Sequence, residues 1–217
     1  MQIALREYVD EAGRNPFGRW FDGLDAASAA KVTTALARVE QGNFSRAKGV
    51  GAGVFEYRIH FGPGYRVYFG KDGCTFVILL AGGTKNRQSQ DIALAQERWG
   101  RLQGAKDQGR VTMPLTRNFK ATVQARIARD PKYRKELLRE GVECLLSGDL
   151  DTGKAILRDY INATIGFEEL SNMTHTPTKS LMRMLGPKGN PQARNLFDVI
   201  AHLQRTEGLH FELSLKA

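Results

Sequence analysis

Two stretches of different pattern meet near residue 104. Before it, short helical segments alternate with strand-like runs that glycines interrupt, and after residue 115 apolar residues recur mostly at helical spacing. The polar segment 104–112 between them contains two glycines and no apolar periodicity, which is typical of a linker. We therefore predict two domains, at 1–103 and 113–217, joined by the linker 104–112.

The first domain has the pattern of a small α+β fold. The expected order is β-α-α-β-β-β-α, because alternating runs indicate half-buried strands and helical periodicity indicates amphipathic helices. Asn15-Pro16 is a typical helix start, and Ser28 is a plausible cap for the second helix. The predicted strands are 2–8, 55–61, 65–69 and 74–81, and the predicted helices are 16–23, 28–41 and 91–102.

The hairpin 55–69 presents a basic and aromatic face. Its alternation directs Tyr57, Ile59, Val67 and Phe69 into the core, and places the polar residues on the other face. With a three-residue loop at 62–64, His60 lies opposite Arg66, and Arg58 lies opposite Tyr68. That second face comprises Glu56, Arg58, His60, Arg66 and Tyr68, and Lys48, Tyr65, Lys85 and Arg87 can extend it.

Such a face suits the cleavage of RNA without a metal or any other cofactor. Arginines pair with phosphate oxygens and remain charged, while a lysine among other cations can act as a base. Tyrosines can stack on a base or transfer a proton. The candidate catalytic residues are Arg58, Arg66, Tyr68 and Lys85, and the candidate RNA-binding residues are Lys48, His60, Tyr65 and Arg87. A solvated basic sheet face is the alternative that the pattern alone leaves open.

The hairpin segment resembles the HigB branch of the RelE/ParE toxins. Its sequence is Phe55-Glu56-Tyr57-Arg58-Ile59-His60-Phe61-Gly62-Pro63-Gly64-Tyr65-Arg66-Val67-Tyr68-Phe69. Leu79-Leu80-Ala81-Gly82-Gly83-Thr84-Lys85 continues the likeness, which covers residues 1 to about 100. The resemblance implies a toxin that cuts mRNA on the translating ribosome, with Arg58, Arg66 and Lys85 in its basic site. The chain departs from the family in having His60 at a position where relatives carry an acidic residue, and in lacking a tyrosine in its last helix.

The second domain has the pattern of a helix-turn-helix. Residues 166–173 and 177–185 form two short amphipathic segments around the turn 174–176, the arrangement that DNA-reading proteins use. Leu170, Leu181 and Leu185 are expected to pack this unit. A plain helical hairpin inside a bundle is the alternative. We also expect helices at 116–129, 131–147 and 149–165, then three further helices of which this pair are the first two, and a terminal strand at 209–215. The candidate DNA-binding residues are Thr176, Thr178, Lys179, Ser180 and Arg183.

After this unit, Gly186-Pro187-Lys188-Gly189-Asn190-Pro191 resembles the HigA antitoxins, and the likeness spans roughly 113–217. It implies a homodimeric repressor that binds operator DNA and neutralises its toxin, in cis or in trans. The net charge of +9 fits nucleic-acid partners. Two distant cysteines and the lack of an apolar N-terminal run indicate a reduced, cytoplasmic protein without a membrane segment. Two other hypotheses for the function stay open. The chain could be a repressor with an inert toxin-like domain, or a toxin that inhibits gyrase.

Overall fold

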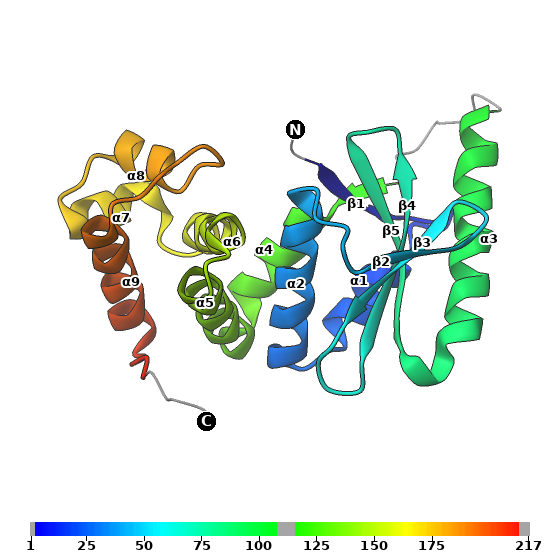
Figure 1. Cartoon of the computed structure of the whole chain (residues 1–217), viewed down its shortest axis with the longest axis horizontal. Helices are drawn as coiled ribbons and strands as arrows, with labels where there is room; N and C mark the ends of the chain where they lie inside the picture. Colours follow the sequence, from blue (N-terminus) through cyan, green and yellow to red (C-terminus); the bar gives the residue numbers. More distant parts are fainter. Residues whose placement is uncertain (1–2, 108–115, 213–217) are drawn as a thin grey trace. The chain divides into compact units, whose positions relative to one another are not determined.

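The computed structural model describes residues 3–107 and 116–212, and these form two compact units, residues 1–123 and 124–217 (Figure 1). The first unit is built on a mixed sheet with the strand order β2-β3-β4-β5-β1-β6. Its strands are β1 (Ala4–Tyr8), β2 (Ala47–Gly51), β3 (Val54–Ile59), β4 (Tyr65–Asp72), β5 (Phe76–Thr84) and β6 (Thr116–Asn118). Strand β1 is parallel to β5, and the other neighbours in the sheet are antiparallel. The expected α+β class is confirmed.

Helices cover both faces of this sheet. Helices α1 (Pro16–Asp22) and α2 (Ala26–Glu40) lie on one face, and α3 (Gln88–Asp107) lies on the other, after the 3-10 turn η1 (Lys85–Arg87) (Figure 1). Asn15 caps α1 as predicted, whereas Asp25 rather than Ser28 caps α2, because its carboxylate accepts from the Ser28 backbone N–H. Trp99 packs α3 onto the sheet with Tyr68 and Leu80.

Three further sequence predictions for this unit need correction. The expected order of elements, β-α-α-β-β-β-α, lacks β2, a short glycine-rich strand that pairs with β3. Residues 104–107 of the predicted linker continue α3, and 108–112 lie outside the described residues. Residues 116–118 form β6 and not the start of a helix, because they pair with β1 at the edge of the first sheet. The helix begins at Phe119.

The second unit is helical. Leu170, Leu181 and Leu185 are buried together in its core, as predicted. Asp130 caps α5 (Pro131–Leu146) through the backbone N–H of Tyr133, which confirms the Asp130-Pro131 start signal. The described part of the predicted terminal strand, residues 209–212, is not a strand, and 213–215 lie outside the described residues. After α4 (Phe119–Arg129), which begins in the first unit, come α5 (Pro131–Leu146), α6 (Leu150–Ala163), α7 (Gly166–Thr174), α8 (Thr178–Met184) and α9 (Ala193–Glu207).

Buried polar contacts hold α6 in this unit. The hydroxyl of Tyr160 donates to Glu207 over 2.5 Å, and Glu207 also pairs with Arg134 at 2.7 Å. Lys154 donates to the carbonyl oxygen of Gly189 over 2.7 Å and thereby fixes the loop after α8. Throughout 3–107 and 116–212, no helix combines the length and the apolar character needed to cross a membrane.

Candidate functional site

The β3–β4 hairpin places two arginines directly opposite each other. Arg58 pairs with Arg66, and Glu56 pairs with Tyr68, so the predicted pairs His60–Arg66 and Arg58–Tyr68 are wrong by two residues. The reason is a longer loop, residues 60–64. Within it Phe61 donates its backbone N–H to Ile59, Gly64 donates to Phe61, and Gly62 and Gly64 adopt positive φ.

A buried carboxylate lies at the centre of this arrangement. Glu56 has no exposed surface. Arg58 Nε donates to Oε2 of Glu56 over 2.7 Å, and Arg66 Nε donates to Oε1 over 3.1 Å. The side-chain amide of Gln88, at the start of α3, donates to Oε1 over 2.8 Å. Glu56 therefore fixes two guanidinium groups from one side. Arg66 Nη1 also donates to the carbonyl oxygen of Gly64 over 3.1 Å, which holds that guanidinium group a second time.

A third arginine lies beside this pair in the backbone. The backbone N–H of Arg58 donates to the carbonyl oxygen of Arg46, a turn residue just before β2. On the other side Arg66 pairs with Gly83 in β5. One row across the sheet thus contains Arg58 and Arg66 and ends at Gly83, a residue without a side chain, while Arg46 lies next to the row at the start of β2. Sequence reasoning missed Arg46, because the Ala-Lys-Gly-Val-Gly strand after it has little apolar signal.

The remaining basic candidates lie around this row. Lys48 is exposed on β2, opposite Glu56, in a strand that the sequence did not predict. Lys85 and Arg87 are exposed in η1, just before the Gln88 that contacts Glu56. His60 is exposed in the hairpin loop.

The two tyrosine candidates are buried on different faces of the sheet. Tyr65 faces α2, where its hydroxyl lies 3.0 Å from that of Ser28. Tyr68 lies under α3, and its hydroxyl donates to Glu56 over 3.3 Å. Burial, with the nearby negative charge of Glu56, raises the pKa of Tyr68 far above its ordinary value. The polar face of the hairpin is therefore only partly open to solvent, because α3 covers Glu56 and Tyr68.

Asp91 is a further buried acid beside the row. Its side chain packs so closely against Gly83 that a Cβ atom there would lie 1.9 Å from Oδ2. Oδ2 has no hydrogen-bond partner within the described structure. Burial raises the pKa of Asp91, and the charges of Arg87 and Arg98 partly oppose this rise.

The helix-turn-helix candidate has the expected local structure in the second unit. Helices α7 and α8 are joined by a turn in which His175 adopts φ 51°, the left-handed conformation that glycine often supplies. The Ser171 hydroxyl donates to the Thr176 carbonyl oxygen over 2.7 Å and closes the turn. Lys179 and Arg183 are exposed on α8, whereas Thr176, Thr178 and Ser180 are half-buried.

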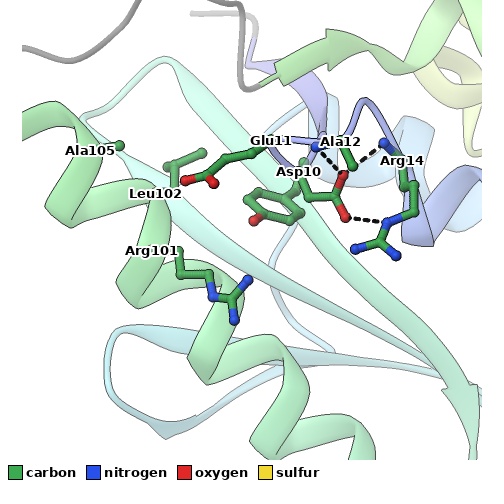
Figure 2. Close-up of a pocket in the computed structure, with 8 residues that line it drawn as sticks. Asp10, Glu11, Ala12, Arg14, Arg101, Leu102 and Ala105 are labelled. Carbon is green, nitrogen blue, oxygen red and sulfur yellow. Dashed lines mark hydrogen bonds and ion pairs between the residues drawn. The ribbon is translucent and has the colours of Figure 1, made fainter.

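A cavity of about 180 Å³ lies elsewhere in the first unit, between the end of β1 and the later part of α3. Figure 2 shows Asp10 turned toward Arg14, whose Nε donates to its carboxylate over 2.7 Å. The backbone N–H of Arg14 also binds this carboxylate, and it lowers the pKa of Asp10. These contacts close the loop after β1. None of the predicted site residues lines this cavity.

Comparison with known proteins finds one informative relative. A Haemophilus influenzae protein, named only "Uncharacterized protein", is 42% identical to this chain over 81 residues, which are 37% of this chain and 82% of that protein. No protein-family model and no solved structure matches the chain.

Proposed function

The chain belongs to the same family as that Haemophilus influenzae protein, and we propose that it is a toxin–antitoxin module in a single polypeptide. In this proposal the first half is a RelE/HigB-like, metal-independent endoribonuclease that cuts mRNA on the ribosome. The second half is a HigA-like homodimeric repressor that neutralises the first half and binds operator DNA. The observation that carries the proposal is the opposed pair Arg58–Arg66, fixed from below by Glu56.

This pair suits a phosphodiester whose charge increases during cleavage. A guanidinium group binds phosphate oxygens through parallel N–H groups, and groups that are held in place before the reaction lose little energy on reorganisation. Arg58 and Arg66 would bind the non-bridging oxygens, and Glu56 is a positioning residue for both. Lys85, exposed in η1 just before Gln88, is the proposed base and in its neutral form would take the proton of the 2′-hydroxyl. The 2′-oxygen would bond to phosphorus as the bond to the 5′-oxygen breaks, and water would return a proton to the departing 5′-oxygen.

The second half supplies a surface for DNA. Lys179 and Arg183 project from α8 into solvent, while Leu181 and Leu185 hold that helix on the core. This is the arrangement in which a short helix can enter a major groove, with lysine on phosphates and arginine on base edges.

The test compares the intact chain with residues 1–123, which retain the whole first unit. Each is added to translating ribosomes with a defined mRNA, and cleavage is mapped by primer extension. We expect residues 1–123 to cut and the intact chain to be silent. Arg66→Ala should reduce cutting at least about a hundredfold, because it removes a fixed phosphate ligand. Arg101→Ala is the matched control, since Arg101 is an exposed arginine on α3 that pairs with Glu97.

A second candidate is a repressor whose toxin-like half is inert. It is favoured by the burial of Tyr68 and by the partial neutralisation of both arginines by one carboxylate. In the same experiment it predicts no cleavage by residues 1–123, together with binding of the intact chain to DNA upstream of its own coding sequence. That outcome would overturn the ribonuclease proposal.

A further inference from the structure

We propose that residues 116–123, here called the clamp, bind the first half of the chain, residues 3–107, whether or not the two are covalently joined. The two halves would then remain one complex after the chain is cut between residues 107 and 116. The partner that fits this surface is the second half as a separate polypeptide. The inference rests on the proposed function only in treating the halves as separable.

The clamp first adds a strand to the sheet. Strand β6 is antiparallel to β1, with Glu7 opposite Arg117 and Tyr8 opposite Thr116. Arg6 also donates to the Thr116 hydroxyl over 3.0 Å. Addition of a strand to a sheet edge gives affinity through main-chain hydrogen bonds, and it needs no covalent connection between the two strands.

Next, the clamp inserts an aromatic anchor. Phe119 is 2% exposed, and its ring meets those of Phe17 and Phe21 edge-on at centroid distances of 5.7 Å and 5.6 Å. Both partners belong to α1, in the first half of the chain. A buried aromatic side chain in a preformed apolar site is the usual centre of a tight interface.

Finally, the clamp supplies two partners to one oxygen of a buried acid of the first half. Glu7 has no exposed surface, and its Oε2 accepts from the hydroxyl of Thr122 over 2.7 Å and from Asn15 over 2.8 Å. Arg117 Nε lies 3.6 Å from the same oxygen. Without the clamp, Glu7 would retain Asn15 but lose both other partners. Another segment without these two partners would leave Glu7 buried with fewer hydrogen bonds, at a cost in free energy. The contact therefore favours the clamp over other segments.

The clamp is distant from the arginine row. Strands β5 and β1 lie between β4 and β6, and Phe119 packs on α1, whereas Arg66 lies on the sheet face that α3 covers. The clamp therefore attaches the second half without covering Arg58 or Arg66. Its loss should release the second half and leave the row unchanged.

The experiment inserts a specific protease site within 108–115 of the full chain, with an affinity tag at the C-terminus. The folded protein is cut, immobilised and washed, and the retained first half is quantified over a series of concentrations. We compare the unaltered clamp with Phe119→Ala, Thr122→Val and the control Ala121→Gln, which changes an exposed position of the same helix. Circular dichroism before cutting verifies that each chain is folded.

We expect the unaltered clamp and Ala121→Gln to retain the first half at micromolar concentration. Phe119→Ala should weaken retention about a hundredfold, and Thr122→Val about tenfold. If Phe119→Ala does not fold, Thr122→Val decides. Separation of the unaltered halves, or equal retention by all folded variants, overturns the inference. Because the readout is binding, it holds or fails independently of whether the first half cuts RNA.

Discussion

Arg58 and Arg66 face each other across β3 and β4, a position in which two like charges would repel, and each donates its Nε to the same Glu56 carboxylate. The carboxylate thus converts a repulsive cross-strand pair into a fixed dication. The chemistry proposed for the site depends on this relationship.

Glu56→Gln should remove the charge that holds the pair together. We expect the free energy of unfolding to fall by about 2 kcal/mol, a value kept small because Arg58 is partly exposed to water. Cleavage by residues 1–123 should fall about tenfold or more, since the guanidinium groups lose their orientation. Urea titration and primer extension measure the two effects. Glu97→Gln, an exposed carboxylate paired with Arg101, should change neither.

Tyr68→Phe tests whether this tyrosine takes part in proton transfer. Its hydroxyl is buried beneath α3, and its pKa is raised by burial first and by Glu56 second. It should therefore stay protonated between pH 5 and pH 9. We expect cleavage rates within about threefold of the unaltered protein, the same pH–rate profile and a stability loss of about 1 kcal/mol or less. A profile that loses one limb in the variant would assign Tyr68 a catalytic role after all.

Asp91→Asn should change how stability depends on pH. The pKa of Asp91 is raised in the folded protein, so this group favours folding below its ordinary pKa of 3.8 and loses that contribution as pH rises through the folded value. The asparagine variant lacks this loss. Its stability relative to the unaltered protein should therefore increase from pH 4 toward pH 7. Parallel denaturation curves at several pH values measure the difference, and a constant difference would contradict the expected ionisation.

Two glycine substitutions test the packing of α3 with opposite signs. A Cβ atom at Gly70 would lie 2.3 Å from the Trp99 ring, so Gly70→Ala should destabilise the first unit by about 1–3 kcal/mol. Gly100 lies in α3 with open space around it, and Gly100→Ala should stabilise that unit by about 0.5–1 kcal/mol through helix propensity. Thermal unfolding of residues 1–123 compares the two.

Lys179→Ala and Arg183→Ala should affect DNA binding differently. Loss of a lysine on phosphate weakens binding uniformly and lowers the salt slope by about one, whereas loss of an arginine on a base edge costs about 1–3 kcal/mol and relaxes specificity at one position. Titrations with upstream and scrambled DNA at several salt concentrations separate these effects. Lys132→Ala, at an exposed position on α5, is the control. Equal effects on both DNA sequences from Arg183→Ala would exclude base readout by this residue.

Local patterns predicted the helices and the sides on which most hairpin side chains lie, but Tyr65, expected beside the basic face, lies on the opposite face under α2. Asn15 and Asp130 cap helices as expected, and Val67 and Phe69 point into the core. The hairpin register was missed because a shift by two residues keeps every side chain on the same face. Alternation therefore cannot distinguish a three-residue loop from a five-residue loop.

Long-range contacts were beyond the sequence patterns. Glu56 reads as a solvated residue of a polar face, and only the packing of α3 shows that it is buried. Likewise, nothing local in Thr116-Arg117-Asn118 indicates a strand, because its partner β1 lies more than 100 residues earlier in the chain. Asp91 was missed for the same reason, because only the packing of α3 against Gly83 shows that it is buried.

The position of β6 also has a consequence for solubility. With β6 in place, β1 is an interior strand, paired on both sides. Without it, β1 becomes an open edge of the sheet, next to the apolar site on Phe17 and Phe21 that Phe119 would leave empty. Such open edges are templates for self-association. A first half produced in excess of its partner segment would then tend to aggregate. Residues 116–123 would thus also protect the edge of the sheet. The amount of dissolved first half without this segment would be limited by its low solubility.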